Sequence, residues 1–263
     1  MKPVKIVAIC ASPRKKASYY VAEKALEAAA AVDPRIETEL IGFAGKRIEP
    51  CVACDYCKKN KTWCILQDDM QPMFDQLKDA DGILVVSPVY TMAATPQLHA
   101  FCSRMRPAMH CFPDILRNKF FAAVAVGGTR NGGQEATVMD IINLFGTRTM
   151  NLVTNEVGGY TGGKVWSRDQ GAEGAAEDQI GMKTVVDLAA KLAEVCLTYR
   201  LGKEARPRKK HKKQTAVEFH SGFSVNMKYL RKKAQKIVDL QQKVCYTNKL
   251  NQSGKVCSFL TRV

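Results

Sequence analysis

Short apolar runs alternate with amphipathic segments through the first 200 residues of the chain. The apolar runs predict strands at the following places: Val4–Cys10, Ile36–Ile41, Gly82–Ser87, Phe120–Val126 and, more weakly, Asn151–Val157. Helical periodicity predicts the intervening helices: Val21–Ala31, Asp69–Lys78, Thr95–Met105, Gln134–Phe145 and Asp178–Tyr199. This alternation is typical of a parallel sheet with crossover helices on both faces. The pattern therefore predicts an α/β fold with a doubly wound, five-stranded parallel sheet.

Three strand-exit loops have unusual compositions. The first, Ala11–Ser18, combines hydroxyls and Arg14 with the N-terminus of a helix, which predicts a phosphate cradle. The second is Ser87–Ala93, and the third, Gly127–Gln134, is rich in glycine, so its backbone can approach a flat ligand closely. Ligands of doubly wound sheets bind at the carboxyl ends of the strands. Together the three loops predict one site at that edge.

Four cysteines lie within fourteen residues, in the spacing C-x2-C-x2-C-x6-C: Cys51, Cys54, Cys57 and Cys64. Two-residue gaps bring successive thiolates to the inside of one tight loop, and the longer gap lets the chain return with a fourth ligand. This arrangement suits a 4Fe-4S cluster, in which each iron takes one sulfur ligand. A structural zinc site and a disulfide pair remain alternatives, although zinc sites usually space two C-x2-C pairs further apart.

The remaining cysteines and the flanking segments indicate a reducing compartment. Cys10, Cys102 and Cys196 fall in apolar or helical patterns and are expected to be small buried hydrophobes. The sequence has neither a signal-peptide pattern nor an apolar stretch of membrane-spanning length. We expect a cytoplasmic protein.

The net charge of +15 is concentrated in the last quarter of the chain. Residues 1–200 hold 24 lysines and arginines against 22 acidic residues, whereas residues 201–263 hold 16 against three. This shift predicts a core domain of residues 1–200 and a basic extension of residues 201–263, with an amphipathic helix at Val225–Cys245. The extension suits an acidic electron-transfer protein, an anionic membrane or nucleic acid, or a helix packed on the core or a neighbouring subunit.

Taken together, residues 3–199 resemble the iron–sulfur flavoprotein branch of the flavodoxin-like NADPH-dependent FMN reductases. The resemblance is carried by the cysteine loop and by four further segments: Ser12–Arg14, Cys64–Met70, Ser87–Tyr90 and Gly127–Glu135. It implies a flavodoxin-like fold, a cluster loop at about residues 46–66, and a homodimer or homotetramer.

The resemblance also implies the cofactors and the residues that hold them. FMN would be bound with its phosphate on Ser12, Arg14 and Ser18. The isoalloxazine would be bordered by two sets of residues: Pro88, Val89, Tyr90 and Thr91 on one side, and Gly128, Thr129 and Gly133 near the other edge. The family's phosphate loop usually continues with a threonine, where this chain has Tyr19-Tyr20.

The resulting functional prediction is a redox enzyme or electron carrier that passes electrons between FMN and a 4Fe-4S cluster. NAD(P)H or a ferredoxin-like protein would be the donor; no G-x-G-x-x-G fingerprint follows any strand, so a nicotinamide would stack on exposed flavin. One alternative is an FMN-dependent dehydrogenase or reductase of a small, chorismate-like ring. Another is a zinc-stabilised nucleic-acid-binding protein.

No side chain stands out as a general acid or base; Tyr90 and Arg130 would polarise a substrate or, more simply, position the flavin. Gly158–Lys164 matches the glycine and lysine positions of a phosphate-binding P-loop, but Val165 replaces the hydroxyl that binds magnesium. We expect a glycine turn there.

Overall fold

The computed structural model describes residues 2–156 and 158–205. The bounds of its helices and strands follow the chain in this order: β1 Val4–Cys10, α1 Ala17–Ala30, β2 Ile36–Gly42, α2 Tyr56–Asn60, α3 Met70–Leu77, β3 Gly82–Pro88, α4 Pro96–Ser103, α5 Arg106–His110, β4 Phe120–Gly127, α6 Gln134–Gly146, β5 Asn151–Leu152, β6 Gly163–Trp166, α7 Gly171–Glu177 and α8 Gln179–Ala205. The predicted basic helix at Val225–Cys245 lies outside the described residues.

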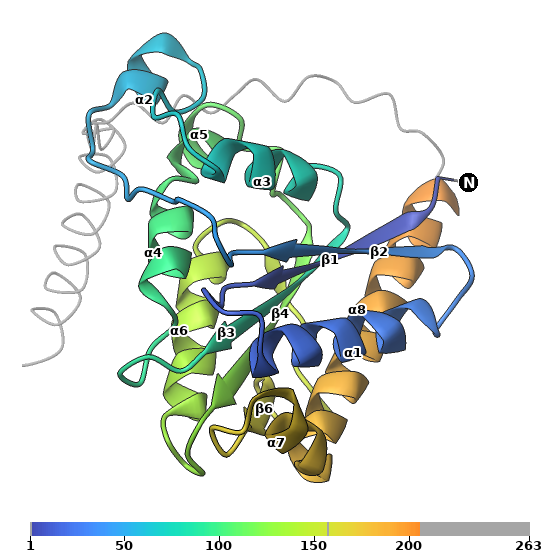
Figure 1. The fold of residues 1–263 in the computed structure, drawn as a ribbon. Coiled ribbons are helices and arrows are strands. Elements are labelled where there is room, and N and C mark those ends of the chain that lie inside the picture. The colour runs from blue at the N-terminus through green and yellow to red at the C-terminus, as the bar shows by residue number, and fades with distance from the viewer. Residues whose placement is uncertain (1, 157, 206–263) are drawn as a thin grey trace, which may run out of the picture. The chain divides into compact units, whose positions relative to one another are not determined.

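The strands form one parallel sheet in the order β2-β1-β3-β4-β5, with β6 also paired to β4 (Figure 1). The chain proceeds from β1 outward to β2 and then returns to the other side of β1 with β3. The direction of winding therefore reverses between β1 and β3, which is the topological switch point where doubly wound sheets bind ligands. The predicted flavodoxin-like α/β fold is confirmed.

Helices cover both faces of this sheet, as the apolar runs require. On one face, α1 and α8 pack on alternate strand residues such as Ala8, Leu84 and Val124. On the other face, α3, α4 and α6 pack on the intervening residues, such as Ile9 and Val85. Because successive side chains of a strand point to opposite faces, a continuous apolar run supplies both cores at once.

The fifth strand differs from the prediction. Only Asn151–Leu152 of the predicted segment is a strand, and Val157 lies outside the described residues. The strand β6, which was not predicted, lies further along the chain. Both short strands pair with β4: Leu152 of β5 with Phe121, and Val165 of β6 with Val126. One strand position is thus shared by two short strands. The alternation in Gly163–Trp166 was obscured by the preceding glycines.

The helices begin and end near the predicted positions, with two differences. Helix α1 begins at Ala17, four residues early, because Ala17 and Ser18 are already buried against the core. Helix α8 continues to Ala205, past the composition boundary at Leu201, so the shift in charge does not coincide with the end of the helix.

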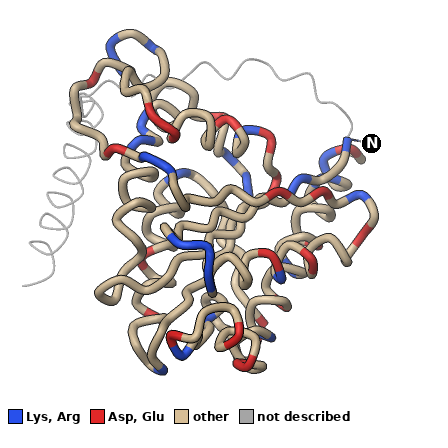
Figure 2. Tube along the Cα trace, viewed as in Figure 1, with Lys and Arg blue, Asp and Glu red and all other residues tan. Residues whose placement is uncertain are grey.

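Charges of both signs are interspersed over residues 2–156 and 158–205, and the longest run of consecutive basic residues in these ranges is Arg14–Lys16, in the loop before α1 (Figure 2). Within the same ranges, no helix combines the length and hydropathy that crossing a bilayer requires.

Candidate functional site

A cavity of about 320 Å³ opens at the switch point, between the loops that follow β1, β3, β4 and β6. Its size lies within the range of small-molecule sites. Seven of the ten residues predicted to bind a cofactor line it: Ser12, Arg14, Ser18, Pro88, Val89, Tyr90 and Gly128. Residues from three separate loops therefore converge as the strand-end argument requires.

The end of this cavity near α1 combines basic side chains with the first turn of a helix. The Ser12 hydroxyl accepts from the Arg14 amide at 3.2 Å and donates to the Arg14 carbonyl at 2.7 Å, which curls the loop. Ser18 is buried in the first turn of α1, where backbone N–H groups and the helix dipole favour negative charge. The side chains of Arg14 and Lys16 add two cations to the lining.

The other three predicted residues lie beside the cavity rather than in its lining. Thr91 belongs to a tight turn in which Tyr90 and Ala93 exchange backbone hydrogen bonds of 2.9 and 3.0 Å. Thr91 and Met92 both have positive φ in this turn, which is strained for residues with side chains. Gly133 packs under the turn, since a Cβ there would lie 3.0 Å from the Met92 Cα. Thr129 is exposed.

Four polar or flexible residues of the lining were not predicted: Lys16, Ser167, Asp169 and Gly171. Three of them follow β6, and recognition of that strand from Lys164-Val165-Trp166 would have identified its exit loop. Asp169 lies so close to Gly128 that a Cβ there would be 2.1 Å from the Asp169 Oδ1. The cavity is thus cationic near α1 and acidic near β6.

The surroundings of Tyr19 show the role of the tyrosines that this chain has in place of the usual threonine of the phosphate loop. Its hydroxyl accepts a hydrogen bond from the Ala44 amide at 2.9 Å and lies against Gly42. The side chain ties α1 to the end of β2, and Tyr20 packs against the same core. Both tyrosines therefore serve packing and do not line the cavity.

A second cavity is lined by all four cysteines of the motif: Cys51, Cys54, Cys57 and Cys64. The loop turns sharply at Ala53, Asp55 and Lys61, which all have positive φ. The Ala53 amide also points at the Cys51 sulfur, at 3.4 Å. Such turns of non-glycine residues are strained and recur around bound groups.

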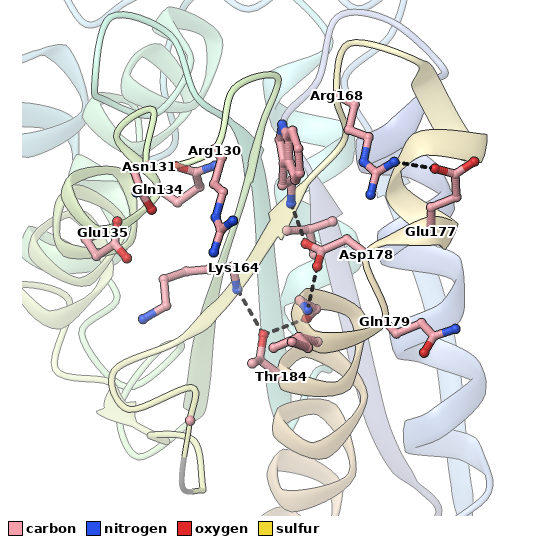
Figure 3. A pocket seen from close by; sticks show the side chains of 15 residues that line it. Arg130, Asn131, Gln134, Glu135, Lys164, Arg168, Glu177, Asp178, Gln179 and Thr184 are labelled. Carbon is pink, nitrogen blue, oxygen red and sulfur yellow. Dashed lines mark hydrogen bonds and ion pairs between the residues drawn. The ribbon is translucent and has the colours of Figure 1, made fainter.

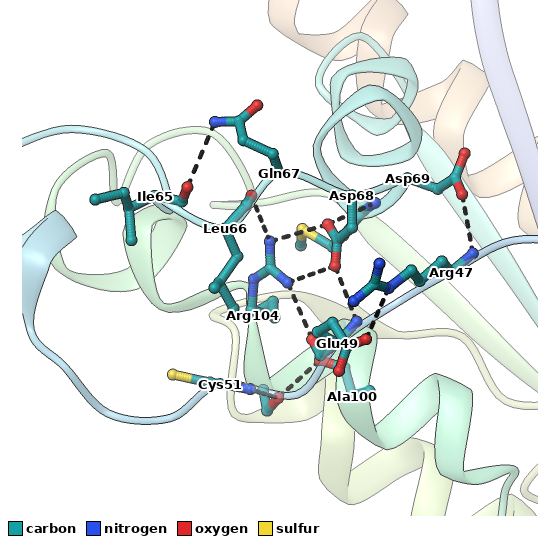
Figure 4. Close-up of polar contacts among 12 residues, drawn as sticks. Arg47, Glu49, Cys51, Ile65, Leu66, Gln67, Asp68, Asp69, Ala100 and Arg104 are labelled. Atoms are coloured by element: carbon teal, nitrogen blue, oxygen red, sulfur yellow. Dashed lines mark hydrogen bonds and ion pairs between the residues drawn. The ribbon is translucent and has the colours of Figure 1, made fainter.

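The end of α4 and the segment that follows hold this loop at four points. Ser103 accepts from the Cys51 amide at 3.0 Å, Arg106 pairs with Asp55 at 2.7 Å, and the Cys111 thiol lies 3.2 Å from the Cys57 carbonyl. Arg104 makes the remaining contacts, to the two ends of the loop (Figure 4). One short stretch of chain therefore shapes the whole cysteine loop.

The four motif cysteines share one cavity, but within residues 2–156 and 158–205 no three His, Cys, Asp or Glu side chains are close enough together to hold one metal ion. A zinc ion needs its four ligands at bonding distance from one point, whereas a 4Fe-4S cluster separates its four sulfur ligands at the corners of a larger unit. Four thiolates are suitable ligands for either group.

The other cysteines in the described part of the chain have different surroundings. Burial raises the pKa of the Cys10 and Cys102 thiols to about 12, and it also raises the pKa of Cys196. These three are protonated core residues, as predicted. Burial, with the neighbouring Cys111 thiol, raises the pKa of Cys57 too. Cys111, half-buried beside Cys57, was not singled out from the sequence.

A third cavity, of about 520 Å³, lies between the start of α6, β6 and the start of α8 (Figure 3). Lys164 and Arg130 line it; Arg168 also lines it but pairs with Glu177 at 2.6 Å. Lys164 lies within a strand instead of opening a helix, so the P-loop-like sequence is not a P-loop. Arg130 lines this cavity, whereas Tyr90 lines the cavity at the switch point.

The chain is similar to known flavin proteins. Residues 4–160 match the family model described as NADPH-dependent FMN reductase. An iron-sulfur flavoprotein of Archaeoglobus fulgidus is 37% identical over 195 residues, which is 72% of this chain and 96% of the relative. One of Methanocaldococcus jannaschii is 38% identical over 194 residues, covering 73% of this chain and 97% of the relative.

Among solved structures, a flavone reductase superposes with a TM-score of 0.55 at 20% identity, over 75% of this chain. The match covers 64% of that reductase, so the chain spans less than two thirds of its length. At this identity the likeness concerns the fold alone.

Proposed function

Because this chain belongs to the NADPH-dependent FMN reductase family, we propose that it is an iron–sulfur flavoprotein that passes electrons between FMN and one 4Fe-4S cluster. Membership of the family makes the chain an FMN-dependent oxidoreductase. The proposal adds the cluster, the residues that hold each cofactor and the route of the electrons. The observation that carries it is the cavity that all four motif cysteines line, in a protein of flavodoxin-like fold.

In this proposal FMN occupies the switch-point cavity. Its phosphate would lie at the N-terminus of α1, where Arg14 and Lys16 supply charge and Ser18 a hydroxyl donor. Asp169, at the acidic end of the cavity, suits the ribityl hydroxyls, which can donate to a carboxylate. Pro88, Val89 and Tyr90 would then border the isoalloxazine.

Thr91, Thr129 and Gly133 have a different part in the proposal. The strained turn that contains Thr91 rests on Gly133, so these residues would set the position of Tyr90 beside the flavin. Thr129 accepts a hydrogen bond from Gln134 at 2.8 Å through its carbonyl, which fixes the loop that contains Gly128.

The cluster would be held by Cys51, Cys54, Cys57 and Cys64. FMN exchanges electrons as a hydride pair or singly, and a 4Fe-4S cluster exchanges one at a time. The cysteine loop follows β2, while the loops of the other cavity follow β1, β3, β4 and β6. Both sites therefore develop from the carboxyl edge of the same parallel sheet, an arrangement that suits electron exchange between them.

The partners are proposed on more general grounds. NAD(P)H fits the family's description, and an acidic ferredoxin-like protein fits the positive charge of residues 201–263. A homodimer or homotetramer remains the proposed assembly.

A pair of cysteine variants tests the cluster. Cys57→Ser removes a proposed ligand, whereas Cys111→Ser removes a thiol that lies beside Cys57 but outside the motif. We expect Cys57→Ser to lose the broad visible absorbance and most of the iron while retaining FMN, and Cys111→Ser to keep both. If Cys57→Ser retains full iron, or if only Cys111→Ser loses it, the ligand assignment is wrong.

A further inference from the structure

We infer that Arg104 is a positioning residue of the cluster site, which closes the cysteine loop at its base and directs its Nε–H toward the sulfur of Cys64. This inference rests on the proposed function. It assigns a role to a residue that has no place in the cysteine motif and lies 40 positions beyond its last cysteine.

Arg104 joins the two ends of the loop. Its Nη1 donates to the Glu49 carbonyl at 3.0 Å, just before Cys51, and its Nη2 donates to the Leu66 carbonyl at 3.2 Å, just after Cys64. The same two nitrogens grip the Asp68 carboxylate at 2.7 and 3.1 Å (Figure 4). The Asp68 carboxylate in turn accepts a hydrogen bond from the Glu49 amide at 2.9 Å. The two chain segments at the base of the loop therefore meet at one ion pair.

This ion pair is fully buried, with side-chain exposures of 0% for Arg104 and 1% for Asp68. Burying two charges is unfavourable unless every donor and acceptor is satisfied. Four of the donor directions of Arg104 are used, but its Nε is buried and has no hydrogen-bond partner among the described residues. A buried guanidinium with one unused donor calls for an acceptor in the cavity that it lines.

The cluster cavity supplies that acceptor. Arg104 lines the cavity together with Cys64. Burial lowers the pKa of Arg104, but its interactions with Asp68 and Cys64 outweigh burial and raise it. N–H groups directed at ligand sulfurs, and positive charge near them, favour the more reduced state of an iron–sulfur cluster.

Two measurable consequences follow. Without Arg104 the ends of the loop are untied, so the apoprotein should take up the cluster less completely. Where the cluster is retained, the loss of the charge and of the Nε–H should lower its midpoint potential. Lysine cannot replace arginine fully, because an ammonium group cannot make the fork to Asp68 and reach both carbonyls and the sulfur together.

The experiment compares Arg104→Gln and Arg104→Lys with the wild type after anaerobic reconstitution. Iron and sulfide per chain, the EPR spectrum of the reduced protein and the midpoint potential are measured, and bound FMN reports whether the fold is intact. We expect Arg104→Gln to retain FMN but to hold at most half the wild-type iron. Arg104→Lys should hold more iron than Arg104→Gln, with a lower midpoint potential than the wild type and an altered EPR spectrum.

Arg117→Gln is the control. Arg117 is exposed, pairs with Asp114 at the surface and does not line the cluster cavity. The iron content of this variant should match that of the wild type. If Arg104→Lys equals the wild type in iron, EPR spectrum and potential, or if Arg117→Gln loses as much iron as Arg104→Gln, the inference is overturned. If the wild type itself takes up no iron, the proposed function fails instead.

Discussion

At the scale of single residues, three loops at the ends of strands bring charged and hydroxyl side chains together around one cavity. Ser12 uses its hydroxyl to curl the loop, so in the proposed function Arg14, Lys16 and Ser18 would face the phosphate. The sequence predicted Ser12, Arg14 and Ser18 for this position, because they lie at the N-terminus of a helix that follows a strand, whereas Lys16 was not predicted. The sequence did not show which of these side chains shapes the loop and which lines the cavity.

Arg14→Gln should weaken FMN binding through the phosphate. Loss of one charge-assisted hydrogen bond corresponds to roughly 1.5–3 kcal/mol, so we expect the dissociation constant of FMN to rise about 10- to 100-fold. Titration of the apoprotein, followed by flavin fluorescence, measures it. Riboflavin lacks the phosphate, so its affinity should not change, and Lys15→Gln, outside the cavity lining, should leave both affinities unchanged. An equal loss for riboflavin would place the phosphate elsewhere.

The Asp68 carboxylate makes the free energy of unfolding depend on pH in the acid range. Burial alone would raise its pKa, but hydrogen bonds from Arg104 and from the amides of Glu49 and Met70 outweigh burial and lower it. Its contribution is therefore present above the unfolded-state pKa of about 3.9 and is lost as the pH falls through the lower, folded-state value.

Asp68→Asn isolates this contribution. At neutral pH the variant leaves Arg104 without its carboxylate and should be about 3–5 kcal/mol less stable in urea unfolding of the apoprotein. The difference from the wild type should stay constant down to about pH 5 and shrink below about pH 4. A difference that stays constant through that acid range would show that Asp68 is not the titrating group.

At the scale of elements, the strands β1 to β4 and the longer helices follow from apolar patterning, whereas β6 and the short helices α2, α5 and α7 were not predicted. The continuous runs of β1, β3 and β4 are buried on both faces and read clearly. The four residues of β6 follow a glycine-rich turn, so their pattern is too short to stand out. Because β6 was not predicted, its exit loop was not recognised, and Ser167, Asp169 and Gly171 were not predicted to line the cavity.

The contact between the β4–α6 loop and the turn after β3 can be tested with two glycines. Gly133→Ala places a Cβ 3.0 Å from Met92 backbone at a φ of +103°, so we expect a loss of about 1–3 kcal/mol in unfolding free energy. Gly146 ends α6 with open space around it, so Gly146→Ala should be neutral or stabilising by up to about 1 kcal/mol. Equal effects of the two changes would mean that the close contact has no energetic weight.

At the scale of the whole molecule, charge separates two parts of the chain. The sequence predicted a nearly neutral core and a basic extension, and the described residues that line the candidate sites all belong to the core. The positions of the four thiols around one cavity were foreseeable from their spacing. Their support by the α4–α5 segment was not, because Arg104 and Cys111 lie far from the motif in sequence.

Removal of residues 206–263 tests this separation. The segment contains 15 lysines and arginines against two acidic residues. We expect the shortened chain to retain FMN and iron but to accept electrons more slowly from a reduced, acidic ferredoxin. The full chain's rate should fall toward that of the shortened chain as salt rises to about 0.15 M, because screening weakens long-range attraction. A salt-independent rate common to both chains would contradict a docking role.

The most direct test of the account is the composition of one anaerobically purified sample. Iron, acid-labile sulfide, zinc and released flavin are quantified together with the visible spectrum. The account predicts about four irons and four sulfides per chain, with one FMN and no stoichiometric zinc. Stoichiometric zinc in place of iron, with the four cysteines intact, would contradict it.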